Sequence, residues 1–434
     1  MARIVLTTFG TLGDLNPYIA VARELGARGH RPVIATHASY RERVERAGSE
    51  FHPVRPDFTD FGDLEEVYRR SMDARGGSRY VVLRLALPFV RASYEDIRAA
   101  CRGADALVSH MLTFAAPLVA EQGDIPRIHT LLQPYSLFSA FDPPLDGSMP
   151  GFALLRHLGP RACRQLWSLA RAVSRRWFHD VASLRAELGL RSRAHPLFDG
   201  FSSALNLALF SPVLAPPQPD WPPRTVVTGF PIHDRDEQGE GMPPELRSFL
   251  DEGPAPIVFT LGSSGVWSAG SFYDEAASAA ALLGMRVVLL TGANRPTALP
   301  RGVIAVSYAP HSELFPRAAV VVHQGGIGTT GQALRSGRPM LIVPFSHDQP
   351  DNAARCARLG VARVVPRCSA SARRLARELR ALMDDAEMRS SAEQVALRVR
   401  AEDGARTAAD AIEALLDARC SASPRRASAT LAGP

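Results

Sequence analysis

A glycine-rich turn between an expected strand and an expected helix is the part of the chain best suited to bind a phosphate. The apolar run Ala318–Val322 predicts a buried strand, and Thr329–Ser336 predicts a helix. Between them lie His323 and three glycines, Gly325, Gly326 and Gly328. Free backbone N–H groups and the positive end of a helix dipole would both face a ligand at such a turn. We therefore expect a phosphate-binding site here.

A second cluster of polar residues follows the next apolar run, Met340–Pro344, which also predicts a strand. It consists of Asp348, Gln349 and Asn352. Three hydrogen-bonding side chains at the carboxyl end of a parallel strand suit a polyhydroxylated ligand such as a sugar. Phosphate and sugar sites side by side favour an enzyme that uses a nucleotide sugar.

The elements that position these residues alternate between strands and helices. In the first half we expect strands at Arg3–Thr8, Arg31–Thr36, Ala104–Ser109 and Arg127–Leu132, with a helix at Asn16–Gly26. This alternation is typical of a parallel sheet with right-handed crossovers. The fold class is therefore α/β, with doubly wound sheets.

A proline-rich segment, Ser211–Pro223, divides the chain, because proline lacks a donor and fixes φ. The strands expected after it are Thr225–Thr228, Ile257–Leu261, Arg286–Leu290, Val303–Val306, Ala318–Val322 and Met340–Val343. The two halves should form two α/β domains. Ligands in such sheets bind at the carboxyl ends of the strands.

At this point the chain resembles the family 1 glycosyltransferases, inverting enzymes with the GT-B fold of two Rossmann-like domains. Their donor signature is similar to His-Gln-Gly-Gly-Ile-Gly-Thr-Thr from His323 and to Pro-Phe-Ser-His-Asp-Gln from Pro344. Their opening is similar to Gly-Thr-Leu-Gly-Asp-Leu-Asn-Pro from Gly10. The middle segments at 215–222, 228–231 and 308–310 look closest to the rhamnosyltransferases of rhamnolipid synthesis. Sterol and macrolide glycosyltransferases fit these segments less well.

The resemblance implies that the chain is divided into five parts. They are an acceptor-binding domain at residues 1–212, a linker at 213–224, a nucleotide-sugar-binding domain at 225–404, a helix returning to the first domain at 405–418, and a disordered tail at 419–434.

Asp14 is the general base that the resemblance implies for the acceptor hydroxyl. An unperturbed carboxylate is a poor base, so we expect burial to raise its pKa. The alternative is that Asp14, in the loop after the first strand, only caps the helix that follows. His110 ends the strand Ala104–Ser109, where plant relatives carry an Asp that steadies a catalytic histidine. A pairing of His110 with Asp14 is one hypothesis, and an ordinary histidine lining the cleft is the other.

The donor site follows from the same motifs. His323, Ser263, the hydroxyl of Thr329 and the backbone N–H groups of the turn are expected to hold the diphosphate in place of a metal. Tyr308 and His311 match the positions that contact the nucleobase, and Asp348, Gln349 and Asn352 those that hold the sugar. Tyr308 has an alternative as an ordinary core residue, and Asp348 as a helix cap. The only Asp-x-Asp string, at 234–236, is interpreted as a solvated loop, so no metal site is expected.

One departure from the family bears on the choice of donor. Plant relatives carry a Glu eight residues after the motif histidine, and its carboxylate accepts hydrogen bonds from the ribose hydroxyls. This chain has Gly331 there, followed by Gln332. The difference favours a dTDP-sugar over a UDP-sugar donor, and both stay open.

The acceptor is expected to be a hydrophobic small molecule, lipid or aromatic, because Tyr80–Val90 and Thr130–Phe138 are apolar. A helix with Trp167, Ala170, Val173 and Trp177 on one stripe has arginines around it. It either touches a membrane surface or packs on its own domain.

Composition excludes several other classes. The net charge is +6 and all 50 basic residues are arginine, but charges of both signs are interspersed and no arginine-rich run is interleaved with aromatics, so nucleic-acid binding is not expected. Five scattered cysteines indicate neither a zinc site nor a disulfide framework. Neither a signal peptide nor an apolar run long enough for a membrane span is found, so we expect a soluble cytoplasmic protein. The oligomeric state is left open.

Two rival functions share the fold. A nucleotide-sugar epimerase would not need the Asp14 opening or the apolar acceptor segments. A non-catalytic helper of a transferase would be expected to lose the donor motif, which this chain keeps.

Overall fold

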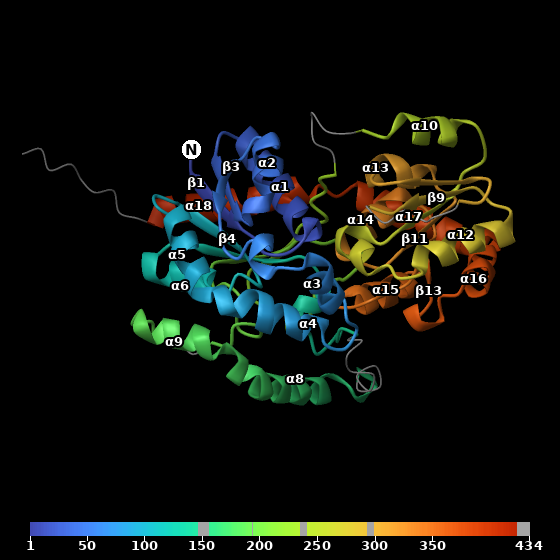
Figure 1. The fold of residues 1–434 in the computed structure, drawn as a ribbon. Coiled ribbons are helices and arrows are strands. Elements are labelled where there is room, and N and C mark those ends of the chain that lie inside the picture. Colours follow the sequence, from blue (N-terminus) through green and yellow to red (C-terminus); the bar gives the residue numbers. More distant parts are fainter. Residues whose placement is uncertain (146–155, 193, 235–240, 293–298, 423–434) are drawn as a thin grey trace, which may run out of the picture.

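The computed structural model describes residues 1–145, 156–192, 194–234, 241–292 and 299–422. Two parallel sheets lie side by side, each covered by helices (Figure 1). The first sheet has the strand order β3-β2-β1-β4-β5-β6-β7. The second has the order β10-β9-β8-β11-β12-β13. All strand pairs are parallel, which confirms the predicted doubly wound α/β class.

The strands of the first sheet are β1 (Arg3–Thr7), β2 (Arg31–Thr36), β3 (Glu50–Pro53), β4 (Ala106–His110), β5 (Arg127–Leu131), β6 (Leu205–Ala208) and β7 (Thr225–Val227). Those of the second are β8 (Ile257–Thr260), β9 (Val287–Leu290), β10 (Val303–Val306), β11 (Val320–His323), β12 (Met340–Ile342) and β13 (Ala362–Val364).

The helices of the first domain are α1 (Leu12–Ala27), α2 (Arg41–Arg46), α3 (Leu64–Ser71), α4 (Gly77–Tyr80), α5 (Val90–Ala100), α6 (Ala116–Gly123), α8 (Pro160–Ser174) and α9 (His179–Glu187). Those after the first sheet are α10 (Pro244–Asp251), α11 (Gly262–Gly265), α12 (Phe272–Leu283), α13 (His311–Leu314), α14 (Ile327–Ser336), α15 (Gln349–Arg358), α16 (Ala372–Asp384), α17 (Ala386–Arg400) and α18 (Gly404–Ala422).

The boundary between the domains differs from the prediction. We expected Thr225–Thr228 to open the second domain, but β7 pairs with β6 and is the edge strand of the first sheet. The proline-rich segment therefore connects two neighbouring strands of one sheet. A periodicity of apolar residues cannot tell which of two sheets a strand joins, which explains the error.

The last helix, α18, packs on the first domain. Its buried residues Ala408, Ala409 and Ile412 share a core cluster with Ile4 and Leu6 of β1. Figure 1 shows α18 behind the strands of that sheet. Residues 419–422, expected to begin a disordered tail, are helical, and residues 423–434 lie outside the described part of the chain.

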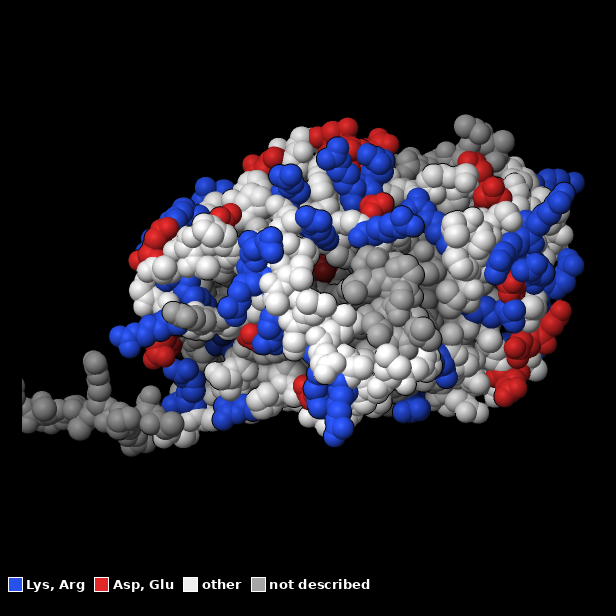
Figure 2. Space-filling view, turned by 90° about the horizontal axis from the view of Figure 1, so that it is seen from below, with Lys and Arg blue, Asp and Glu red and all other residues white. Residues whose placement is uncertain are grey.

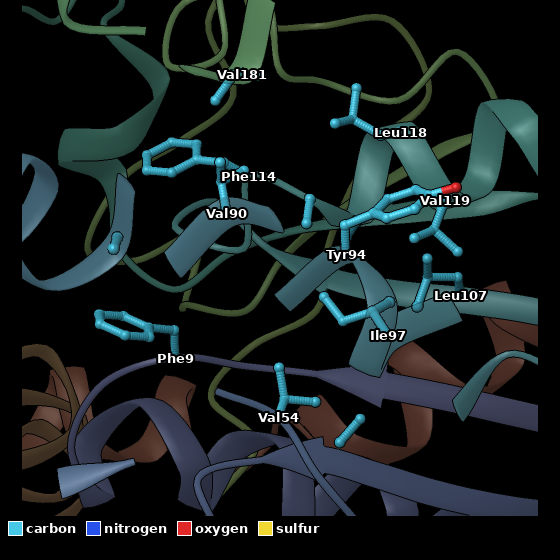
Figure 3. Close-up of a cluster of buried hydrophobic side chains, with 14 of the residues drawn as sticks. Phe9, Val54, Val90, Tyr94, Ile97, Leu107, Phe114, Leu118, Val119 and Val181 are labelled. Atoms are coloured by element: carbon cyan, nitrogen blue, oxygen red, sulfur yellow. The ribbon is translucent and has the colours of Figure 1, made fainter. Parts of the chain in front are cut away.

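The apolar stretch Tyr80–Val90 contributes mainly to the core of the first domain. Val82, Leu85, Leu87 and Val90 are buried in a cluster with residues of α5 and α6. Figure 3 shows part of this cluster, with Val90 and Phe114 across from Phe9 and Val54. The four buried residues of this stretch are therefore core residues and are not exposed to an acceptor.

Candidate active site

Asp14 lies in the first turn of α1, not in the loop where we expected it. Thr11 is the N-cap residue, and its hydroxyl accepts a hydrogen bond from the N–H of Gly13. The Asp14 Oδ2 atom accepts one from the N–H of Thr11 at 2.7 Å, which completes a capping box. The helix thus begins four residues earlier than predicted. Asp14 therefore takes part in capping the helix through Oδ2, and Oδ1 stays outside the capping bond.

The environment of Asp14 makes its carboxylate more basic than usual. Its side chain is 29% exposed. Burial raises its pKa to about 6, although the hydrogen bonds from Thr11 act in the opposite direction. Gly10, with φ of +133°, lies against the carboxylate so closely that a Cβ there would overlap it. A side chain at position 10 is therefore not tolerated without moving Asp14.

His110 is the last residue of β4, beside β1, and faces Asp14. Its Nε2 lies 4.0 Å from Oδ1 of Asp14, too far for a hydrogen bond. The ring is buried, and neither nitrogen has a hydrogen-bond partner among the described residues. Burial lowers the pKa of His110 to about 4, so the ring is neutral at pH 7. The predicted proximity is present, while the predicted hydrogen bond is not.

The glycine turn joins β11 to α14, and the ring of His323 lies beneath it. His323 Nδ1 accepts a hydrogen bond from the N–H of Gly325 at 3.1 Å, where φ is +92°. Its Nε2 contacts the sulfur of Met340 at 3.3 Å. The ring is fully buried, and its pKa is lowered to about 3 by that burial. In this arrangement His323 shapes the turn instead of presenting an N–H to the cleft, because both nitrogens are already engaged.

The start of α14 has the features of an anion site. Gly326 is the N-cap residue and offers no side chain to the first N–H groups, and a Cβ at Gly328 would meet open space. The helix begins at Ile327, two residues before the predicted start. Thr329, largely buried, lies in its first turn. Backbone donors are therefore free to meet a diphosphate here.

Ser263 and a residue that the sequence reasoning missed, Gln324, lie near this turn. Ser263 is exposed in α11, directly after β8, which pairs with β11. The Gln324 amide lies so close to Gly262 that a Cβ there would overlap it, and it is 2.9 Å from the Cβ position of Gly326. Gln324 thus connects the two loops. The motif itself contains this residue, but only the fold shows which loop it contacts.

The sugar cluster lies at the start of α15. Asp348 occupies the N-cap position without a side-chain capping bond. Its Oδ2 accepts from Nδ2 of Asn352 at 2.6 Å, and the same amide donates to the carbonyl of Gly325 at 2.9 Å. Gln349 is buried, and its Oε1 accepts from the backbone N–H groups of Phe345 and Ser346. The structure therefore joins the sugar cluster to the glycine turn.

The negative charge of Asp14 affects the ionisation of Asp348. Burial raises the pKa of Asp348 to about 7, and the charge of Asp14 contributes to that rise. Asp14 belongs to the first domain and Asp348 to the second. The predicted base and the predicted sugar ligand are thus close enough to interact electrostatically.

The loop around Asp234 is not a freely solvated loop, as we had interpreted it. The Asp234 carboxylate accepts from the N–H of Ser312 at 2.7 Å and from Nε2 of Gln332 at 2.9 Å. Its carbonyl accepts from the hydroxyl of Tyr308 at 2.6 Å. Asp236 lies outside the described residues. Asp234 therefore connects the end of β10, the start of α13 and α14.

Tyr308 and His311 flank this junction. Tyr308 is 40% exposed, so the alternative of an ordinary core residue is wrong. His311 stacks on Phe315 with 4.3 Å between ring centroids, and burial lowers its pKa to about 4. An exposed phenol ring and a neutral imidazole together can contact a nucleobase.

Gly331 has no room for a side chain. A Cβ there would lie 2.9 Å from the ring of Phe230, which enters from the segment after β7. The carboxylate that plant relatives carry at this position could not fit here without moving Phe230.

The helix with the predicted apolar stripe is α8, and part of the stripe faces inward. The Trp167 ring contacts Phe138 with 5.3 Å between centroids, and Trp177, just beyond the helix, packs on the core of the first domain. The exposed apolar residues are Leu169 and Val173. Figure 2 shows basic side chains at separate points among uncharged ones on the lower face of the molecule. The packing alternative is therefore confirmed for both tryptophans.

No group of three acidic, histidine or cysteine side chains among the described residues has the geometry to hold a metal ion. No helix among those residues is both long enough and apolar enough to cross a membrane.

Comparisons with known proteins agree with this geometry. Residues 4–126 match the model of the glycosyltransferase family 28 N-terminal domain. Residues 278–415 match the erythromycin biosynthesis protein CIII-like C-terminal domain. The O-mycaminosyltylonolide 6-deoxyallosyltransferase of Streptomyces fradiae is 33% identical over 97% of this chain and 99% of its own. The chain therefore belongs to the family 1 glycosyltransferases and is a glycosyltransferase.

Other relatives show how widely the fold is shared. A sterol 3-beta-glucosyltransferase of Leptosphaeria maculans is 30% identical over 82% of this chain, which matches 25% of that longer protein. The calicheamicin glycosyltransferase CalG4 is 19% identical, with a TM-score of 0.72 over 96% of this chain and 98% of its own. The glycosyltransferase VinC, solved in complex with dTDP, is 22% identical, with a TM-score of 0.67 over 96% of this chain and 100% of its own. These structures confirm the GT-B fold.

Proposed function

We propose that the protein transfers a sugar, with inversion, from a nucleotide diphosphate sugar to a hydroxyl of a hydrophobic small molecule. Asp14 takes the proton of that hydroxyl. The acceptor oxygen forms a bond to the anomeric carbon, and the bond from that carbon to the diphosphate breaks, so that the diphosphate leaves with the electron pair. The observation that carries this proposal is the position of Asp14 in the first turn of α1, with Nε2 of His110 4.0 Å from its Oδ1 atom and with burial that raises its pKa to about 6.

The donor's diphosphate would be held by backbone N–H groups at the start of α14, with the hydroxyls of Thr329 and Ser263. These fixed dipoles stabilise the leaving group without a metal ion. His323 contributes by holding Gly325 in its left-handed conformation. The sugar would be oriented by Asp348, Asn352 and Gln349. The nucleobase would be contacted by Tyr308 and His311.

His110 would act through Asp14. A neutral imidazole 4.0 Å from the carboxylate can donate a hydrogen bond after a small movement, when the acceptor has excluded water. That bond would hold Asp14 in the orientation that receives the proton.

We infer that the donor is a dTDP-sugar. Phe230 fills the space in which a ribose-binding carboxylate would have to lie at position 331. A pocket without a partner for the 2′-hydroxyl disfavours a ribonucleotide, since that hydroxyl would lose its hydrogen bonds to water. The dTDP complex of VinC supports the same choice.

The acceptor is proposed to be a natural-product or sterol aglycone. By their names, the Streptomyces fradiae relative acts on O-mycaminosyltylonolide and the Leptosphaeria maculans relative acts on sterols. A hydroxylated lipid is the second candidate acceptor. It follows from the resemblance of the middle segments to the rhamnolipid-forming enzymes.

Binding of dTDP and UDP, without divalent metal, tests the proposal. A nucleotide at about 100 times its Kd should stabilise the fold by roughly 3 kcal/mol, which a melting curve resolves. Tighter binding of dTDP supports the deoxynucleotide donor, and tighter binding of UDP contradicts it. Binding of neither would contradict the transferase proposal, and turnover of a nucleotide sugar to its epimer without acceptor would support the epimerase.

A further inference from the structure

A band of aromatic rings runs from the end of β1 in the first domain to the second domain. The rings belong, in order, to Phe9, His37, Phe58, Tyr68 and Trp267. Successive ring centroids are 5.1, 4.7, 6.4 and 5.6 Å apart. These distances fall in the range of direct aromatic contact. We refer to these five residues as the aromatic band.

The inner end of the aromatic band touches the residues that hold Asp14. His37 Nε2 accepts a hydrogen bond from the N–H of Gly10 at 3.3 Å, and Gly10 lies against the Asp14 carboxylate. Phe58 stacks on His37, and Tyr68 contacts Phe58, so the middle of the band continues directly from this end. The aromatic band is therefore next to the proposed base.

The outer end of the band comes from the second domain. Trp267 follows Ser263 by four residues, and its ring is 41% exposed. The planes of Tyr68 and Trp267 are nearly parallel, at 8°. The hydroxyl of Ser268 donates to the carbonyl of Tyr68 at 3.4 Å. The band is thus complete only when the two domains face each other as they do here.

The cavity behind the inner end is too small for an aglycone. It is lined by Phe9, His37, Val54, Val90 and Phe114, several of which Figure 3 shows, and its volume is about 20 Å³. Such a volume holds about one water molecule. The rings of Phe58, Tyr68 and Trp267 continue the same band and are partly exposed, so they offer a bulky acceptor the aromatic contact that the cavity cannot.

We propose that Phe58, Tyr68 and Trp267 form the wall against which the aglycone packs, and that this wall selects a rigid ring system over an acyl chain. Aromatic faces offer a wide, stiff contact to a fused or large ring, which loses little conformational entropy on binding. An acyl chain must give up rotamers to lie flat on such a wall, and it gains contact on one side only. This inference rests on the proposed function and narrows its acceptor class.

Steady-state kinetics with two acceptors test this proposal. Cholesterol in cyclodextrin represents a rigid ring system, and 3-hydroxydecanoate represents an acyl chain. The variant Trp267→Ala should raise the KM for cholesterol about tenfold, as expected for loss of an aromatic contact. The KM for the donor and the acceptor-free hydrolysis of the donor should stay within about twofold. Trp267→Phe should restore most of the affinity. Leu169→Ala removes an exposed apolar side chain of α8 and should leave both KM values unchanged.

Tryptophan fluorescence gives a second readout that does not need turnover. Cholesterol should change the emission of the wild-type protein and not that of Trp267→Phe. Three results would each contradict the proposal that this wall binds the aglycone. They are an unchanged KM for cholesterol in Trp267→Ala, a preference of the wild type for 3-hydroxydecanoate, and no change in the wild-type emission. Loss of donor binding and donor hydrolysis in the wild type would instead count against the proposed function.

Discussion

His110 Nε2 lies 4.0 Å from Asp14 Oδ1, and the two residues have opposite pKa shifts. Burial raises the pKa of Asp14 to about 6 and lowers that of His110 to about 4. At pH 7 the pair is therefore a carboxylate beside a neutral imidazole. This is the protonation state that a general base supported by a hydrogen-bond donor requires.

The first prediction concerns Asp14→Asn. The amide cannot take a proton, so kcat should fall at least about 100-fold, the size typical of losing a general base. The Kd of dTDP should not change, because Asp14 lies outside the proposed phosphate site. Pre-steady-state turnover and calorimetry measure the two quantities. Near-normal turnover would remove Asp14 from the mechanism.

The pH dependence of the wild-type enzyme follows from the same group. Asp14 must be ionised to accept a proton, so kcat/KM should be half-maximal near pH 6 and should level off above that pH. His110→Asn keeps a hydrogen-bond donor near the carboxylate and should keep most activity, whereas His110→Ala should not. Equal rates for the two variants would argue that His110 only lines the cleft.

A second prediction concerns how the free energy of unfolding depends on pH. The direction of this dependence follows from the pKa of Asp348. The pKa of this group is about 7 in the folded protein and 3.8 as a model value, so the folded state binds more protons between these limits. Its contribution to the free energy of unfolding should therefore fall as pH rises from about 4 to 7. Asp348→Asn should melt a few degrees higher than the wild type at pH 8 and about equally at pH 4.

The exposed carboxylate of Glu42 offers a matched control for this stability prediction. Its side chain is 85% exposed, so Glu42→Gln should leave the difference in melting temperature between pH 4 and pH 8 unchanged. Asp348→Asn should also raise the KM for the donor, since the group is proposed to hold sugar hydroxyls. A variant that is less stable than the wild type at pH 8 would contradict the linkage argument.

A third prediction concerns Asp234, which joins three elements around the proposed site for the nucleobase. Asp234→Ala removes the acceptor for Ser312 N–H and Gln332 Nε2 while leaving the backbone carbonyl that binds Tyr308. We expect the KM for the donor to rise about tenfold, because a lost charge-assisted hydrogen bond weakens the positioning of Tyr308 and His311. The KM for the acceptor should not change. An equal rise in both KM values would indicate a general loss of structure.

Much of this site could be predicted because its residues lie in short motifs. The glycine turn, Asp348 and Asn352 are found from sequence since strand, turn and helix follow one another along the chain. The capping role of Asp14 was harder, because the helix start depends on Thr11 and not on the apolar pattern that the prediction used.

The contacts that were missed join residues far apart in sequence. Asp234 binds Gln332 across 98 positions, and Ser268 binds Tyr68 across 200. Arg355 and Asp351, both buried, pair at 2.8 Å within α15, and Arg355 also pairs with Asp142 of the first domain. No local periodicity encodes such pairs, because they depend on how two independently formed sheets face each other.

The last prediction tests why this chain has a glycine at position 331. A Cβ there would lie 2.9 Å from the Phe230 ring, so Gly331→Ala should destabilise the protein by about 1–3 kcal/mol through overpacking. Phe230→Ala should itself cost stability, since it removes a partly buried ring. In the double variant the methyl group enters space that the ring has left, so the two effects should not add. Chemical denaturation of the wild type and three variants measures the coupling.

The same pair bears on the choice of donor. If Phe230 occupies the space of a ribose-binding carboxylate, Phe230→Ala combined with Gly331→Glu should bind UDP more tightly relative to dTDP than the wild type does. A shift of about tenfold in the ratio of the two Kd values corresponds to one hydrogen bond to the 2′-hydroxyl. Gly331→Glu alone should fail to produce that shift, because the ring still fills the space. An additive stability cycle, together with an unchanged ratio of Kd values, would show that Phe230 and Gly331 only pack and do not select the nucleotide.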